Sequence, residues 1–77
     1  MEHLLASNLR RYRNYQGWSQ EALSKRSGVP KSVIVAIESG KEPLPDSDVL
    51  LALARVLDRS VGDFFREPLT LNRVRWN

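Results

Sequence analysis

The side chains best suited to binding chemistry in this sequence lie within residues 18–41. Ser19 and Gln20 open one predicted helix, and Lys31 and Ser32 lie in the first turn of the next. Hydroxyl, amide and ammonium groups donate hydrogen bonds to phosphate oxygens and to the edges of nucleic-acid bases. The sequence has no HExxH or CxxC motif, no phosphate-binding loop and no nucleophile placed beside a general base. It therefore predicts neither an enzyme nor a metal or cofactor site.

Two short helices joined by a glycine turn must position these side chains, and they are predicted over residues 19–27 and 30–39. Ser19 is placed to cap the first helix, and Gly28 lies where the chain must reverse, in a conformation that glycine adopts most easily. Pro30 is tolerated in the first turn of the second helix because that turn needs no N–H donor. A helix of this length, held across such a turn, fits the major groove of duplex DNA.

Two longer amphipathic helices are predicted on either side of this pair. The first ends near Gly17, and its apolar residues at helical spacing are Leu4, Leu5, Leu9 and Tyr12. The second begins at Asp46 or Ser47, after a rigid loop that contains two prolines. Its apolar stripe consists of Val49, Leu50, Leu53, Ala54 and Leu57. Both stripes are suited to packing against one shared core.

A short fifth helix is predicted after this stripe. Ser60 and Asp63 have the spacing of a capping box, and Phe64 and Phe65 follow them directly. The five elements together predict an all-α domain over residues 1–66, with one core.

The character of the sequence changes in residues 67–77. Leu69, Leu71, Arg73 and Arg75 alternate with Thr70, Asn72, Val74 and Trp76, which is the period of an extended strand. We expect a short extended C-terminal tail. Either it packs against the domain or a partner chain, or it is a linker into a longer protein, and both alternatives stand.

Composition limits the class of protein and its partners. The 77 residues suffice for one small domain, the formal net charge is +3, and cysteine is absent. The positive charges gather in the first half, at Arg10, Arg11, Arg13, Lys25, Arg26 and Lys31, and acidic residues follow in the second half. This distribution predicts a basic face against an acidic back, which suits a phosphate-binding module, although a solvated charged surface has the same composition. No apolar run has membrane length and no secretory pattern is present, so the expected compartment is the cytoplasm.

Residues 9–65 carry a set of positions that resembles a known family. The matching residues are Arg13, Trp18, Ser19, Gln20, Glu21, Leu23, Gly28, Val29, Ile34, Ile37, Glu38, Gly40, Lys41, Pro45 and the stretch 53–57. In type and spacing they resemble the Cro/cI-type helix-turn-helix domain of the XRE family of prokaryotic and phage regulators. The resemblance implies a lambda-repressor-like fold, sequence-specific binding to double-stranded DNA as a transcriptional regulator, usually a repressor, and action as a homodimer on paired half-sites.

The outward face of the second helix of the pair is the predicted base-reading surface. Because Ile34 and Ile37 point inward, helical geometry turns this face outward. Together with the resemblance, it gives the base-reading candidates Pro30, Lys31, Ser32, Val35 and Ala36. The aliphatic Val35 and Ala36 can contact thymine methyl groups or exclude a competing base. Val33 is assigned to the core or to a dimer contact instead.

The resemblance also implies phosphate contacts and a brace around this helix. It assigns Gln20 to a backbone phosphate at the N-terminus of its helix, and the other phosphate candidates are Ser19, Arg10, Lys25, Ser39 and Lys41. An Arg13–Glu38 ion pair is expected to brace the base-reading helix. Two positions depart from the family. Ser24 replaces a usual alanine, and we expect its hydroxyl to bond back along its own helix. Glu42 stands where a basic residue is common.

The dimer surface is predicted at the C-terminal end of the domain, with the candidates Phe64, Phe65, Leu69, Leu71 and Trp76. The alternative to a DNA-binding regulator is a protein-interaction module, such as an antitoxin-like domain, whose apolar C-terminal half binds a partner protein. A further alternative is that the chain is the N-terminal DNA-binding part of a longer regulator.

Overall fold

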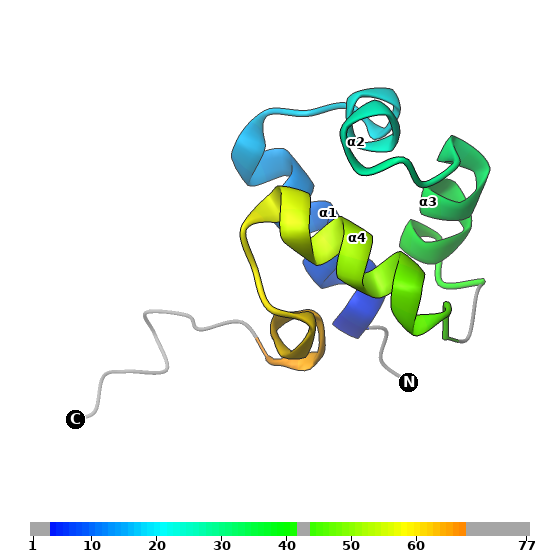
Figure 1. Cartoon of the computed structure of the whole chain (residues 1–77). Coiled ribbons are helices and arrows are strands. Elements are labelled where there is room, and N and C mark those ends of the chain that lie inside the picture. Colours follow the sequence, from blue (N-terminus) through cyan, green and yellow to red (C-terminus); the bar gives the residue numbers. More distant parts are fainter. Residues whose placement is uncertain (1–3, 42–43, 68–77) are drawn as a thin grey trace.

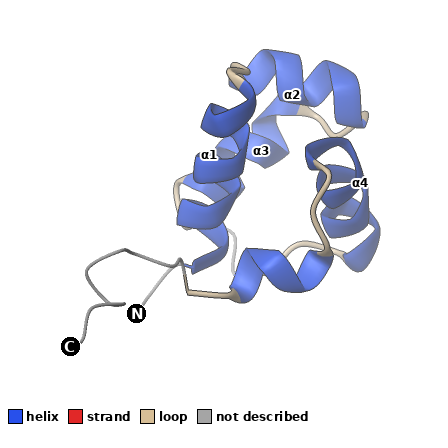
Figure 2. Cartoon of the chain, turned by 90° about the vertical axis from the view of Figure 1, so that its left-hand side faces the viewer, coloured by secondary structure: helices blue, strands red, loops and turns tan. Residues whose placement is uncertain are grey.

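The structure is a computed structural model that describes residues 4–41 and 44–67. Within these residues the chain forms four α-helices and one 3-10 helix: α1 (Leu4–Gln16), α2 (Gln20–Ser27), α3 (Lys31–Glu38), α4 (Ser47–Leu57) and η1 (Val61–Phe65). Figures 1 and 2 show α2 at one end of the α1–α4 pair and η1 at the opposite end. The all-α prediction is confirmed for this part of the chain. None of its helices is long and apolar enough to cross a membrane.

The prediction of a fifth α-helix is wrong, because Val61–Phe65 forms a 3-10 helix. The capping box that suggested it is present: the backbone N–H of Asp63 donates to Ser60 Oγ (3.3 Å), and that of Ser60 donates to Asp63 Oδ2 (3.0 Å). Five residues are too few for a series of α-helical hydrogen bonds, and Gly62 lowers the helix propensity further. Pro68 also disfavours helix at the residue before it.

The caps of α2 and α3 form the predicted turn. Ser19 Oγ accepts a hydrogen bond from the backbone N–H of Ala22 (3.0 Å), so Ser19 caps α2. Gly28 has a φ of 79°, in the left-handed region that closes a helix, and its N–H donates to the carbonyl oxygen of Ser24 (2.9 Å). Pro30 is the N-cap of α3 rather than its first residue. The predicted limits 30–39 are therefore one residue too wide at each end.

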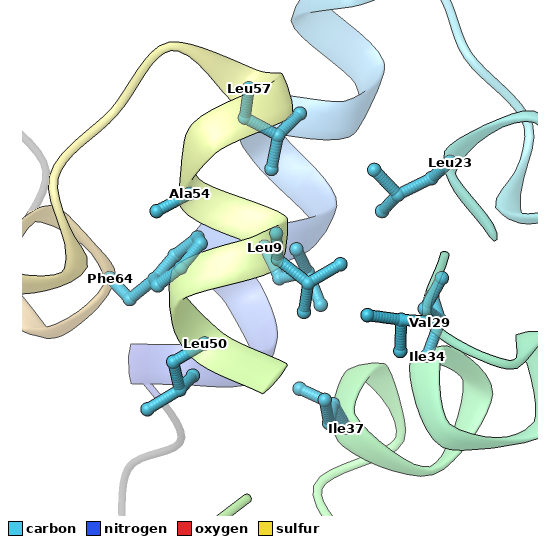
Figure 3. Packing of buried hydrophobic residues seen from close by; sticks show 10 residues of the cluster. Leu9, Leu23, Val29, Ile34, Ile37, Leu50, Ala54, Leu57 and Phe64 are labelled. Atoms are coloured by element: carbon cyan, nitrogen blue, oxygen red, sulfur yellow. The ribbon is translucent and has the colours of Figure 1, made fainter. Parts of the chain in front are cut away.

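A single apolar core joins all five elements. Its fully buried side chains are Leu9 from α1, Leu23 from α2, Ile34 and Ile37 from α3, Leu53 and Leu57 from α4, and Phe64 from η1. Figure 3 shows the labelled members of this cluster meeting between the ribbons. Each such side chain contributes about 1.5–3 kcal/mol on burial. The core therefore fixes α2 and α3 through their inner faces and leaves their outer faces free.

The burial of Phe64 corrects one of the predicted dimer contacts. Its side chain is 0% exposed, and its ring lies 5.9 Å from that of Tyr12, so it belongs to the core. The prediction that Phe64 contributes to a dimer surface is wrong, because the turn of η1 directs it inward and only its neighbour Phe65 remains exposed, at 42%. The other three candidates, Leu69, Leu71 and Trp76, lie outside the described residues, as does the predicted extended tail.

A buried asparagine fastens η1 to α1. Asn8 is 1% exposed, and its Nδ2 donates to the carbonyl oxygens of Phe64 and Arg66, each at 2.8 Å. The hydroxyl of Tyr12 donates to the carbonyl oxygen of Asp63 (2.9 Å). The Asn8 bonds satisfy the carbonyl groups of Phe64 and Arg66 at the end of the short 3-10 helix, and the Asp63 carbonyl also accepts from the backbone N–H of Arg66 (3.4 Å). One face of α1 thus holds η1 in place.

Candidate nucleic-acid interface

The outer face of α3 presents the predicted base-reading residues to solvent. Lys31, Ser32 and Val35 are exposed, as is the capping Pro30, and Ala36 is partly exposed. Ile34 and Ile37 are buried, as the helical geometry predicted. Val33 is half-buried and packs against the core. The five candidates therefore lie between the N-cap of α3 and Ala36, and each of them is exposed or partly exposed.

A two-pronged ion pair holds the other end of α3. Arg13 Nε and Nη2 donate to Glu38 Oε2 and Oε1 at 2.7 and 2.8 Å, and the two side chains are only 13% and 5% exposed. The hydrogen bond to Glu38 raises the pKa of the Arg13 guanidinium above its usual value, although burial opposes the shift. Arg13 Nη1 also donates to the carbonyl oxygen of Trp18 (2.8 Å). The structure thus brings together the predicted pair and ties it to the start of α2.

Gln20 joins this network from the first turn of α2. Its Nε2 donates to Glu38 Oε1 (3.0 Å), so the Glu38 carboxylate receives three hydrogen bonds, two from Arg13 and one from Gln20. We call the Arg13–Glu38–Gln20 group the brace. It links α1, α2 and α3 through one carboxylate, and charge-assisted bonds of this kind are among the stronger ones in proteins. The brace sets how far the start of α2 lies from the end of α3.

The start of α2 keeps donors available beside the brace. Ser19 Oγ accepts from Ala22 N, which leaves its hydroxyl hydrogen for an outside acceptor. The backbone N–H groups of the first turn have no carbonyl partner earlier in the helix, and the helix dipole adds partial positive charge there. This end of α2 is therefore suited to an anion.

Arg10 and Ser39 lie on the opposite side of the same region. Arg10 Nη2 donates to the carbonyl oxygen of Glu38 (3.2 Å) and so helps to cap α3, while its other N–H groups remain available. The hydroxyl of Ser39 donates to the carbonyl oxygen of Ala36 (2.9 Å), which uses its one proton. An open hollow lies between these residues and α2, lined by Arg10, Arg13, Ser19, Gln20, Val35, Glu38 and Ser39. Four of the six predicted phosphate contacts thus share one concave surface.

Comparison with known proteins agrees with this geometry, because the helix-turn-helix family model matches residues 9–64. The chain belongs to the helix-turn-helix family, in its Cro/cI-type XRE group. It is 38% identical to the control protein C.SmaI of Serratia marcescens over 61 residues, which cover 79% of this chain and 71% of that protein. It also matches the N-terminal DNA-binding domain of SinR from Bacillus subtilis with a TM-score of 0.81 and 30% identity, over 86% of this chain and 96% of that domain. The resemblance stated from sequence is confirmed.

Two predicted phosphate contacts of this helix-turn-helix protein lie outside the hollow. Lys25 and Lys41 are exposed and do not line it. Arg26, also on α2, packs its guanidinium over the Trp18 ring at 4.4 Å from the ring centre. A cation held in this way keeps its charge at the surface of α2. The structure therefore separates an inner group of contacts, around the hollow, from outer cations.

The predicted acidic back of the domain is of mixed charge. Asp63 faces Arg66 at 3.5 Å. Arg59 stacks over Tyr12, 4.3 Å from the ring centre, and Arg55 lies exposed on α4. These three arginines offset the acidic residues of the second half, so the prediction of an acidic back does not describe this face. The two faces therefore differ in shape rather than in charge, because the hollow and its available hydrogen-bond donors lie at the α2–α3 end.

The hydrogen bonds of three polar side chains, Ser24, Arg10 and Asn8, were not predicted from the sequence. Ser24 Oγ donates to the carbonyl oxygen of Val29 (2.6 Å), forward across the turn, so the expectation that it bonds back along α2 is wrong. The reason is that the left-handed Gly28 brings the Val29 carbonyl back over the end of α2. The Arg10 cap of α3 and the Asn8 contacts were also missed, although a polar Asn8 beside the buried Leu9 was a visible signal. In the described part of the chain, no three His, Cys, Asp or Glu side chains gather into a group that fits a metal ion.

Proposed function

We propose that this chain is a DNA-binding transcriptional regulator that inserts the N-terminal half of α3 into the major groove of double-stranded DNA and acts as a repressor. Its family, and its likeness to a control protein and to a DNA-binding domain, support the general function. The observation that carries the detailed proposal is the brace. It fixes α3 with its polar face outward, directly beside the exposed N-terminus of α2.

The hollow is proposed to hold one backbone phosphate. Ser19 offers its hydroxyl hydrogen, Gln20 its backbone N–H, and Arg10 its remaining guanidinium N–H groups. A phosphate at a helix N-terminus gains from both the free donors and the dipole. The nearby Glu38 carboxylate does not oppose this binding strongly, because Arg13 neutralises it and its side chain is only 5% exposed.

The remaining polar candidates are proposed to act around this central contact. Ser39 contributes when its hydroxyl turns away from the Ala36 carbonyl oxygen. Lys25 and Lys41 add contacts to flanking phosphates, as exposed cations outside the hollow. The contribution of these two lysines to the binding affinity is electrostatic and does not depend on the DNA sequence. Removing one of them is expected to weaken binding to every duplex alike.

The base contacts are proposed to come from Pro30, Lys31, Ser32, Val35 and Ala36. Lys31 can reach guanine O6 and N7, and Ser32 can bond several bases. Both are exposed in the first turn of α3. The surface has no Arg, Asn or Gln, which are the side chains that form two-pronged base contacts. We therefore propose moderate discrimination by direct contacts, with a further share from DNA shape.

The proposed assembly is a homodimer on two half-sites about one helical turn apart. Residues 1–66 form the DNA-binding domain, and residues 67–77 act as a tail. Phe65 is exposed at the η1 end, away from α2, where a second copy can pack without covering the hollow. Leu69, Leu71 and Trp76 are proposed to extend this surface.

Salt dependence of duplex binding tests the proposal. Neutralising phosphates with basic side chains releases counterions, so affinity falls steeply as salt rises. With about four phosphate contacts per domain, the dissociation constant is expected to rise about a hundredfold between 50 and 200 mM salt for a single bound domain, and about ten-thousandfold for a dimer with twice as many contacts. Fluorescence anisotropy with a labelled duplex measures the affinity at each salt concentration. The slope of log affinity against log salt concentration is called the salt slope. Absence of binding at low salt, or binding that ignores salt, contradicts the proposed function.

A matched pair of variants separates the hollow from general charge. Arg10→Gln and Arg55→Gln remove the same charge from exposed positions, but only Arg10 lines the hollow. Arg10→Gln is expected to lower the salt slope by about one unit. Arg55→Gln is expected to leave it nearly unchanged. Equal slopes for the two variants would show that net charge, and not the hollow, binds DNA.

A further inference from the structure

We propose that Val35 recognises the C5-methyl group of one pyrimidine in each half-site, so that the domain favours thymine or 5-methylcytosine over uracil or unmethylated cytosine there. This inference rests on the proposed binding of α3 in the major groove and names what that surface selects. It makes binding sensitive to cytosine methylation at one defined position.

The exposure of Val35 is the first observation. Its side chain is 41% exposed, although valine is an apolar residue and its neighbours Ile34 and Ile37 are fully buried. Val35 lies one turn beyond Lys31 and Ser32, on the same outward face of α3. A base edge that is contacted by an aliphatic side chain in the major groove gains most when it carries a methyl group. Among the four DNA bases only thymine has one.

The position of Val35 beside the hollow is the second observation. Val35 lines the hollow with Arg10, Ser19, Gln20 and Ser39, so it stands next to the proposed phosphate. In B-form DNA the C5 edge of a pyrimidine faces the major groove on the side of its own backbone. A phosphate in the hollow therefore brings the C5 position of the attached or adjacent pyrimidine toward Val35. The hydrogen-bond donors of the hollow and the aliphatic side chain of Val35 would then contact one short stretch of the same DNA strand.

The chemistry of the contact predicts which bases are equivalent. A methyl group at C5 is common to thymine and 5-methylcytosine, and Val35 offers no hydrogen bond to tell their C4 substituents apart. When the base lacks the C5-methyl group, the apolar side chain of Val35 faces a gap or water instead. The loss expected for one buried methyl group is about fourfold in affinity. Because this contact carries no charge, the factor is expected to be the same at low and high salt.

Competition between two duplex pools tests the inference without a known operator. Random duplexes of about 24 base pairs, long enough for two half-sites, are made with thymine in one tagged pool and with uracil in the other. The tightest-binding fraction is recovered from an equal mixture at two salt concentrations. The wild-type protein is expected to enrich the thymine pool about fourfold for each half-site bound, and so about sixteenfold as a dimer on two half-sites, at both concentrations. A third pool with 5-methylcytosine is expected to be enriched over its cytosine counterpart.

Two variants decide whether Val35 is responsible. Val35→Ala is expected to lose most of the preference for the thymine pool, and its unfolding temperature is expected to stay close to that of the wild type because the site is exposed. Leu51→Ala removes another exposed apolar side chain, 49% exposed on α4, and is expected to keep the full preference. Equal recovery of the two pools by the wild type, or an undiminished preference in Val35→Ala, overturns the inference while salt-dependent binding still stands. If neither pool binds at low salt, the proposed function fails as well.

Discussion

Two faces of α1 use different chemistry to hold the neighbouring elements. On the face toward α3, Arg13 makes a charged, two-pronged contact to Glu38, and the brace borders an open hollow. On the face toward η1, the neutral Asn8 is sealed from solvent and bonds only backbone carbonyl groups. Both contacts fix an element that is too short to hold itself. Of the two contacts, only the Arg13–Glu38 ion pair also borders the hollow that is suited to an anion.

Buried polar groups in this small domain therefore serve separate purposes. Asn8 satisfies carbonyl groups and so maintains the fold. The brace sets the distance between the start of α2 and the end of α3, and in the proposed complex these two elements contact DNA together. Loss of Asn8 should therefore act on stability alone, whereas loss of Arg13 should act on both stability and binding.

The largest effect is expected from Arg13→Met. The Glu38 carboxylate, with its side chain 5% exposed, would lose its cation and two of its three hydrogen bonds. Removing one partner of a buried ion pair typically lowers the free energy of unfolding by about 3–5 kcal/mol. Because Arg13 is partly exposed, we expect a loss of about 3 kcal/mol for this variant. Urea denaturation gives this value, and anisotropy should show weaker duplex binding in the fraction that remains folded.

Arg26→Met is the matched control for Arg13→Met. It removes a guanidinium that stacks on Trp18 at the exposed surface of α2, and the expected cost is below about 1 kcal/mol. Similar losses for the two variants would mean that the ion pair contributes no more than a surface contact. The double variant Arg13→Met with Glu38→Leu should recover part of the stability, but not the DNA affinity.

A smaller effect, confined to stability, is expected from Asn8→Leu. The side chain keeps its size, but the carbonyl groups of Phe64 and Arg66 lose their donor. A buried group left without its hydrogen bond costs about 1–3 kcal/mol. Urea denaturation measures the loss, and duplex affinity at a temperature where the variant is folded should match the wild type. Asn14→Leu, at an exposed position of α1, is the control. Reduced DNA affinity in folded Asn8→Leu would break the separation between the two faces of α1.

The smallest effect concerns pH at the η1 end. The backbone N–H of Ser60 donates to the Asp63 carboxylate and lowers its pKa below the ordinary 3.8. A group whose pKa is lowered in the folded state stabilises the fold above its unfolded pKa, and this contribution is lost as pH falls through the folded pKa. The melting temperature of the wild type should therefore drop more steeply below pH 3.8 than that of Asp63→Asn. Parallel curves would show that this capping box does not contribute.

Local signals in the sequence were sufficient for much of the fold and part of the site. Ser19 and Gly28 mark their caps through residue type alone, and the α3 face followed from the spacing of Ile34 and Ile37. The Arg13–Glu38 pair came from the family resemblance, since contacts 25 residues apart leave no local pattern. The sequence pattern was therefore informative where residues close together along the chain determine the local structure.

The errors arose where tertiary contacts decide the structure. The segment Val61–Phe65 is too short for a periodicity to show which phenylalanine faces inward, and packing on α1 decides for Phe64. The direction of the Ser24 hydroxyl depends on where the turn places the Val29 carbonyl group. The hollow itself combines residues from three helices, so no local stretch of sequence indicates its shape.

DNA is proposed to bind at the braced α2–α3 end of the domain and not at the η1 end. NMR titration of the labelled protein with a duplex at low salt tests it most directly, because backbone amide shifts report each region separately. Large shifts are expected at Ser19, Gln20 and residues 31–36, and small shifts are expected at Asn8 and in Val61–Phe65. Shifts concentrated in α4 and η1, with α3 unchanged, would contradict it.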